Sequence, residues 1–143
     1  MELSGGQEIW VGKLGSIFFS GGFYAYVGSA MNGLDARLAR HLRFEKKFHW
    51  HIDYLLKQAA IREIVLYPSE SKVECSLSMA MAGEFQHIPG FGSSDCHCAS
   101  HLYFGDNLSR LRAEATKAGW PELKEPEIRR YERQVAADNV ESK

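Results

Sequence analysis

The sequence predicts one small α/β domain of the α+β type. Its 143 residues suit a single compact domain and are too few for two large ones. Hydrophobic residues make up 45% of the chain and charged residues 24%, which is typical of folded globular proteins and excludes disorder, collagen and coiled coils. β-branched and aromatic residues are concentrated at residues 7–11 and 16–27, and helical and strand patterns alternate after them.

The expected elements follow the spacing of the apolar residues. Residues 7–11 and 16–27 have the aromatic and β-branched content of strands, and Ser20-Gly21-Gly22 predicts a hairpin turn within the second stretch. Leucines four residues apart predict a helix over 34–47. After it we expect a helix over 48–60, a strand over 61–67, a short helix over 73–83, and an ordered loop over 86–101 that leads into an edge strand.

The C-terminal part is expected to be helical. Asp106 is a suitable N-cap for a helix that ends near residue 119. Beyond it the chain is rich in charge, and Ile128 and Tyr131 belong to an apolar stripe at helical spacing, which predicts a docked helix with a frayed end. The predicted organisation is therefore a core domain over residues 1–105 and a helical extension over 106–143 that packs on the same domain.

Charge and the N-terminal sequence narrow the function classes. Lys and Arg number 17 against 18 Asp and Glu, giving a net charge of -1, so any nucleic-acid site has to be a local patch. No signal or transit peptide is readable after Met1, and we expect a cytoplasmic protein. Residues 14–34 are uncharged and long enough to cross a bilayer, but their Gly, Ser and Asn content predicts strands and no membrane association.

Residues 34–47 form a local basic patch. Five Lys or Arg residues against two acids give this segment a local charge of +3. Arg40, Arg43, Lys46 and Lys47 are therefore the predicted nucleic-acid-binding residues. The alternative is a solvated helix face with no ligand.

Three side chains have the chemistry for phosphoryl transfer. A strand ending at Tyr26 leads to a helix that carries Arg37 and His41 one turn apart, which directs a phenol, a guanidinium and an imidazole toward one point. Arg can hold a phosphate through two hydrogen bonds, and Tyr or His can handle the proton of an attacking water. From spacing alone, a solvated face remains the alternative.

These residues resemble the GIY-YIG endonucleases, in which a Tyr-Ile/Val-Gly half-motif is followed by a helix bearing Arg and then His. The chain is most similar to a prokaryotic branch of that superfamily whose members occur alone or fused to endonuclease III-type repair glycosylases. Five motifs carry the resemblance in order between residues 3 and 104. They are Tyr-Val-Gly-Ser-Ala, Arg-Leu-Ala-Arg-His, Phe-His-Trp-His-Ile-Asp-Tyr-Leu, Val-Glu-Cys and Gly-Phe-Gly-Ser-Ser-Asp-Cys-His-Cys-Ala-Ser-His-Leu.

The resemblance implies a fold, a reaction and a set of roles. The fold is a small antiparallel sheet of three to four strands flanked by helices, and the reaction is Mg²⁺-dependent hydrolysis of a phosphodiester in structured or damaged DNA, as in DNA repair. Tyr26 takes a catalytic or orienting role, Arg37 contacts the phosphate, and His41 moves or orients a proton. Glu74 is the single Mg²⁺ ligand, although a glutamate in the first turn of a helix also suits the helix dipole.

The chain departs from the family at the first half-motif. Gly-Ile-Tyr is expected on a strand before that of Tyr26, and the nearest substitute, residues 15–19, has Phe in place of the tyrosine. Three alternatives stay open. Tyr24 replaces the missing tyrosine, a tyrosine-bearing strand lies ahead of Met1, or the protein is a catalytically impaired nucleic-acid-binding module.

A second cluster contains Cys96, Cys98 and His101. These could supply three of four zinc ligands, but the Cys-x-Cys-x-x-His spacing lacks paired knuckles, so zinc is not expected. We expect a tight turn instead, with thiols packed as small apolar groups and His101 bonded to a buried carbonyl. A zinc-stabilised interaction domain is the third candidate function. His49 and His51 are expected to brace the second helix together with Asp53.

Overall fold

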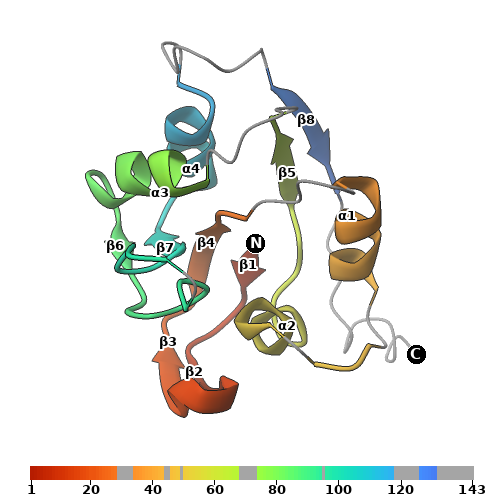
Figure 1. Cartoon of the computed structure of the whole chain (residues 1–143), viewed down its shortest axis with the longest axis vertical. Helices are drawn as coiled ribbons and strands as arrows, with labels where there is room; N and C mark the ends of the chain where they lie inside the picture. Colours follow the sequence, from red (N-terminus) through yellow and green to blue (C-terminus); the bar gives the residue numbers. More distant parts are fainter. Residues whose placement is uncertain are drawn as a thin grey trace.

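The computed structural model describes residues 1–28, 34–43, 46–48, 50–67, 74–94, 96–117 and 126–131. Within these residues the chain is a mixed α+β fold with four α-helices, one four-stranded antiparallel sheet and two small two-stranded sheets (Figure 1). The predicted fold class is therefore confirmed. The two small sheets were not predicted.

The central sheet has the strand order β1-β4-β7-β6, from β1 (Glu2–Leu3), β4 (Gly22–Tyr26), β7 (Leu102–Gly105) and β6 (Gln86–His87). β4 pairs antiparallel with β7, and Tyr26 lies opposite Leu102. β7 is not the predicted edge strand, because the short β6 pairs with its other side. Two residues of strand give too little pattern for the sequence to reveal β6.

A separate hairpin joins β2 (Gln7–Trp10) to β3 (Ser16–Phe19) through the short 3-10 helix η1 (Gly12–Leu14). Gly12 and Gly15 have φ values of +51° and +78°, which favour glycine and make this turn possible. The hairpin predicted at Ser20-Gly21-Gly22 is wrong, because β3 pairs with β2 while β4 pairs with β1 and β7. The chain instead passes there from one sheet to the other.

All four helices agree in type with the sequence prediction but are shorter than expected. They are α1 (Leu34–Leu42), α2 (His51–Leu56), α3 (Glu74–Ala82) and α4 (Leu108–Ala115). α4 is capped by Asn107, whose side chain accepts from the Arg110 amide at 3.2 Å, and not by the predicted Asp106. None of the helices in the described residues has the length and apolar content needed to cross a bilayer.

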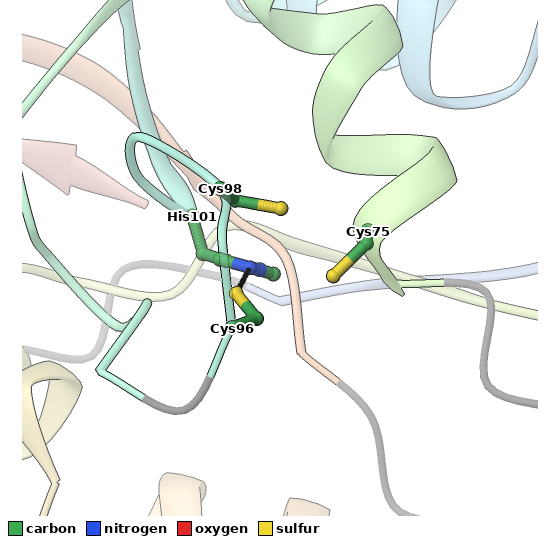
Figure 2. A group of neighbouring side chains, drawn as sticks. All are labelled: Cys75, Cys96, Cys98 and His101. Carbon is green, nitrogen blue, oxygen red and sulfur yellow. Dashed lines mark hydrogen bonds between the residues drawn. The ribbon is translucent and has the colours of Figure 1, made fainter.

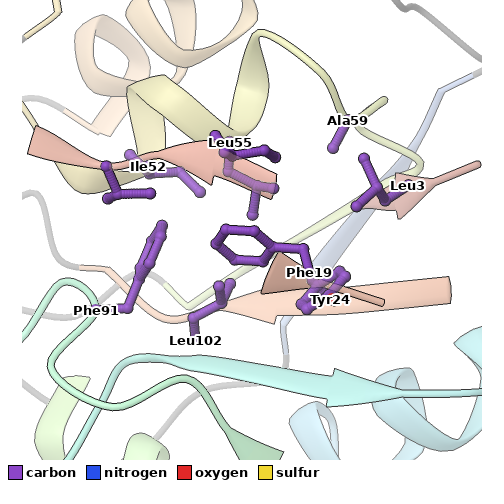
Figure 3. Close-up of a cluster of buried hydrophobic side chains, with 10 residues drawn as sticks. Leu3, Phe19, Tyr24, Ile52, Leu55, Ala59, Phe91 and Leu102 are labelled. Carbon is purple, nitrogen blue, oxygen red and sulfur yellow. The ribbon is translucent and has the colours of Figure 1, made fainter. Parts of the chain in front are cut away.

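The two faces of the central sheet bury different side chains. Tyr24 and Leu102 point toward α2 and the β2–β3 hairpin, where they pack with Phe19, Leu55 and Phe91 in the larger core cluster (Figure 3). The alternate residues of the same strands pack against α3 and α4 in a smaller cluster of Val27, Met81, Tyr103 and Leu111. Tyr26 has the parity of Tyr24 and packs against the larger cluster.

The C-terminal prediction is wrong for residues 127–130. They form β8 (Glu127–Arg130), which pairs antiparallel with β5 (Glu63–Leu66), with Ile128 opposite Val65. Glu63 accepts hydrogen bonds from Arg112 on α4 at 2.9 and 3.2 Å, and Arg130 lies 3.4 Å from it. The partner strand is about 60 positions away, so local periodicity could not reveal this pairing. The frayed end predicted beyond it lies outside the described residues.

Candidate functional site

Tyr26 and His41 come together from different elements. Tyr26 is the last residue of β4, and His41 lies in the final turn of α1. Their ring centroids are 6.4 Å apart in an edge contact. The strand and the helix that the sequence marked as converging therefore do meet.

Trp50 connects the remaining groups of the site. Its ring centroid is 5.7 Å from that of His41, and the Arg37 guanidinium carbon lies over the Trp50 ring at 4.1 Å. A guanidinium over an indole face is held by a cation–π attraction that restricts its orientation. The sequence analysis did not assign Trp50 a role. The two histidines that flank Trp50 were the feature of the sequence that could have drawn attention to it.

Asp53 fixes α1 against α2. Its carboxylate is fully buried and accepts both Nη1 and Nη2 of Arg40 at 2.8 and 2.9 Å, together with the backbone amide of Trp50 at 2.9 Å. The bond to Asp53 raises the pKa of Arg40 above its ordinary value. The Arg40 guanidinium also lies over the Trp50 ring at 4.3 Å, so this pair sets the position of the ring.

Lys46, like Arg40, is bonded to other groups of the protein. Its side chain is only 4% exposed, and its ammonium donates to the carbonyls of Arg40 and His41 at 3.1 Å, at the C-terminus of α1. A cation there complements the negative end of the helix dipole. Of the four predicted nucleic-acid-binding residues, Arg40 and Lys46 thus have protein partners, while Arg43 and Lys47 are exposed to solvent.

His41 is the most strongly perturbed group in this site. Burial lowers its pKa to about 4, and the positive charges of Lys46 and Arg37 act in the same direction. Its Nδ1 atom is buried and has no hydrogen-bond partner in the part of the chain that the structure describes. The imidazole is therefore neutral at pH 7, and the hydrogen-bonding capacity of its buried Nδ1 is unused among the described residues.

The loop between β6 and β7 closes the site on the side of Tyr26. The Phe91 ring is fully buried and contacts those of Tyr26 and His51, with centroids 6.2 and 5.6 Å away. The Gly92 amide donates to His51 Nδ1 at 2.8 Å. His51 therefore holds this loop against α2. The predicted network of His49, His51 and Asp53 stays a prediction. His49 lies outside the described residues.

Gly92 allows the loop to approach Tyr26 closely. Its φ is +72°, and a Cβ atom placed on it would lie 2.9 Å from the Tyr26 ring. Both observations require glycine at this position.

Tyr24, the proposed replacement for the first tyrosine, is a core residue whose hydroxyl already has a partner. The Tyr24 ring is 2% exposed, and its hydroxyl donates to the Ser20 carbonyl at 2.7 Å. Burial raises its pKa to about 12, which makes it a poor base at neutral pH. Phe18, in residues 15–19, is 60% exposed on the separate β2–β3 hairpin, while the strand that pairs with β4 on that side is β1.

Glu74 is the first residue of α3 and precedes Cys75, which belongs to a cluster of thiols and one imidazole. The sequence analysis identified only three of the four members of this cluster. Cys75, Cys96, Cys98 and His101 place one donor atom each within 4.8 Å of one another (Figure 2). His101 is 1% exposed, and its Nδ1 lies 3.1 Å from the Val27 carbonyl, so the predicted bond to a buried carbonyl is confirmed. The sequence analysis, which did not expect zinc, counted only three possible ligands. Cys75 was missed because it lies about 20 positions before Cys96 on another element.

The fold and its residues define a small α+β domain with a Tyr-His-Trp-Arg site on one side of its sheet and a Cys₃His cluster beside the end of β4. The chain belongs to the family described as the domain of unknown function DUF123, whose profile matches residues 1–120. That match extends beyond the predicted boundary at residue 105 and includes α4. No curated protein and no solved structure gives a significant match to the chain.

Proposed function

We propose that this protein is a GIY-YIG-like, metal-dependent DNA endonuclease that hydrolyses a phosphodiester in structured or damaged DNA. The observation that carries the proposal is the setting of His41. Its neutral imidazole, whose buried Nδ1 has no partner among the described residues, lies against Tyr26 on one side and Trp50 on the other. The Arg37 guanidinium stacks on that same Trp50. The imidazole of His41, the phenol of Tyr26 and the guanidinium of Arg37 are thus linked by direct ring contacts. A base, a phenol and a cation that can bind phosphate suit phosphoryl transfer.

Each side chain has a definite part in this reaction. Arg37 binds the non-bridging oxygens of the scissile phosphate, and its stacking on Trp50 orients the guanidinium before the substrate arrives. His41 or Tyr26 orients the attacking water and accepts its proton. The water oxygen forms a bond to phosphorus while the bond to the leaving sugar oxygen breaks, and that oxygen takes up a proton.

Glu74 is the residue that would hold the single divalent ion implied by the resemblance. Mg²⁺ keeps most of its water and needs one or two carboxylates plus phosphate oxygens, and Glu74 supplies one carboxylate at the start of α3. When bound, the ion would neutralise charge that develops on the phosphate oxygens. Glu74 lies next to Cys75, whose cluster reaches the end of β4 through the contact of His101 with Val27.

A catalytically impaired nucleic-acid-binding module is the second candidate. It is favoured by the core position of Tyr24 and by the exposed Arg43 and Lys47, which suit phosphate contacts without any chemistry. Under this alternative the contact of His41 with Tyr26 is only a packing feature. The two candidates differ in whether DNA is cut.

Cleavage of nicked, branched and abasic DNA with Mg²⁺ or Mn²⁺ tests the proposal. Arg37→Ala should lower the cleavage rate by about 10²-fold or more, with a much smaller loss of binding, because its contact strengthens in the transition state. Arg43→Ala is the matched control, since it removes the same side chain from an exposed position on the same segment, and it should affect binding alone. Absence of cleavage by the wild type, with salt-sensitive binding retained, would favour the binding module.

A further inference from the structure

The Cys₃His cluster draws its ligands from two elements far apart in sequence. Cys75 is in the first turn of α3, whereas Cys96, Cys98 and His101 come from the loop that precedes β7. Figure 2 shows the three thiols and the imidazole turned toward one another across the space between helix and loop. All three are free cysteines.

The distances suit one tetrahedral ion. With Zn–S near 2.3 Å and Zn–N near 2.0 Å, tetrahedral angles place ligand sulfurs about 3.8 Å apart and a sulfur and a nitrogen about 3.5 Å apart. The donor atoms of the cluster all lie within 4.8 Å of one another, and Cys96 Sγ is 3.2 Å from His101 Nε2. Small shifts of the side chains therefore suffice to enclose an ion.

The histidine is already in the tautomer that binds a metal. Its Nδ1 lies 3.1 Å from the Val27 carbonyl, and because a carbonyl only accepts hydrogen bonds, Nδ1 carries the proton. Nε2 then has a lone pair, and this is the atom that faces the Cys96 sulfur. A ligand histidine whose second nitrogen donates to a backbone carbonyl is the usual arrangement around zinc.

The protein positions the two halves of the cluster by other contacts. Ser78, one helical turn after Cys75, is fully buried, and its hydroxyl donates to the Ser100 carbonyl at 2.9 Å. Tyr103 donates in turn to the Ser78 carbonyl at 2.8 Å. These bonds hold the helix face that bears Cys75 against the loop end that bears His101.

We propose that Cys75, Cys96, Cys98 and His101 bind one Zn²⁺ ion in a closed, structural site. Three thiolates and one imidazole are a zinc ligand set, and four protein ligands leave no position for substrate. The ion would join the start of α3 to the loop and, through His101, to the end of β4. One consequence, which rests on the proposed function, is that zinc sets the position of Glu74 relative to Tyr26.

Metal content tests the site directly, whether or not the protein cuts DNA. Untagged protein purified without chelators should carry about one zinc per chain, as four protein ligands require. Cys75→Ser should lose most of this zinc. His97→Asn is the matched control, because His97 lies between two of the ligands yet is exposed and outside the cluster, and it should keep the zinc.

A second measurement decides the question even when Cys75→Ser fails to fold. Removal of zinc from the wild type by a chelator should lower its melting temperature, and added Zn²⁺ should restore it. Replacement by Co²⁺ should give the absorption of tetrahedral cobalt with thiolate ligands. A zinc-free wild type whose three thiols react freely in the folded state, or equal zinc in wild type and Cys75→Ser, would overturn the proposal. So would a disulfide within the cluster of the native protein.

Discussion

The chemistry proposed for the site at neutral pH depends on the charge of the His41 imidazole. Burial lowers the pKa of His41 to about 4, and the positive charges of Lys46, Arg37 and Arg40 act in the same direction. A neutral imidazole can accept a proton from water, whereas an imidazolium cannot. A phosphate bound to Arg37 would offset the surrounding positive charge and raise the basicity of His41 when substrate is present.

The lowered pKa of His41 predicts a pH-dependent stability. Its folded pKa, about 4, lies below its ordinary value of 6.5, so the unfolded chain binds the extra proton between these values. Stability from this residue is complete above pH 6.5 and decreases as the pH falls toward 4. Allowing for partial exposure, the decrease is about 2 kcal/mol.

Urea unfolding of wild type and His41→Gln at about pH 7.5 and about pH 4.5 measures this decrease. The variant should show a pH dependence smaller by about 2 kcal/mol. His87→Gln, at an exposed histidine, is the control and should keep the wild-type pH dependence. Equal pH dependence in wild type and His41→Gln would contradict the assignment.

Between elements, a buried ion pair joins α1 to α2. Asp53→Ala should destabilise the protein by about 3 kcal/mol, because it leaves the Arg40 charge and the Trp50 amide without their acceptor. The double variant with Arg40→Ala should lose less stability than the sum of the single variants, by about 1–2 kcal/mol. Denaturant unfolding of the four proteins measures this coupling. Strict additivity would show that the pair does not link the helices.

The conformation of the loop before β7, and its close approach to Tyr26, depend on one glycine, Gly92. Gly92→Ala should cost about 1–2 kcal/mol, because alanine avoids a positive φ and its Cβ would meet the Tyr26 ring. Gly5→Ala is the control, since a Cβ there meets nothing within 4 Å, and its melting temperature should stay near that of the wild type. If both variants melt with the wild type, the loop does not press on Tyr26.

For the molecule as a whole, the net charge of -1 means that the proposed DNA binding would depend on a few local contacts. Arg43→Glu and Lys47→Glu should each weaken binding and reduce the salt slope by about 0.9 for each phosphate that is no longer neutralised. Lys13→Glu makes the same charge change on the β2–β3 hairpin and should leave the slope unchanged. Binding measured across a range of salt concentrations separates these outcomes. An equal effect at Lys13 would mean that overall charge, and not this patch, governs binding.

Local features could be predicted well from the sequence and long-range pairings poorly. The leucine spacing from position 34 predicted α1, and the convergence of Tyr26 with His41 followed from a strand that leads into that helix. Spacing could not show that Asp53 holds Arg40, that β8 pairs with β5, or that Cys75 meets Cys96. Each of these contacts depends on how distant elements pack, which no local period records.

Glu74→Gln distinguishes a nuclease from a binding module most sharply, because it keeps the shape of the side chain and leaves the neighbouring Cys75, a proposed zinc ligand, in place. Cleavage of branched or abasic DNA should be present in the wild type with Mg²⁺ and fall by about 10²-fold or more in Glu74→Gln, because the carboxylate proposed to hold the ion is removed. Zinc content and melting temperature should not change. Wild-type cleavage rates in Glu74→Gln, or no cleavage by either protein under any metal, would contradict a nuclease built on this site.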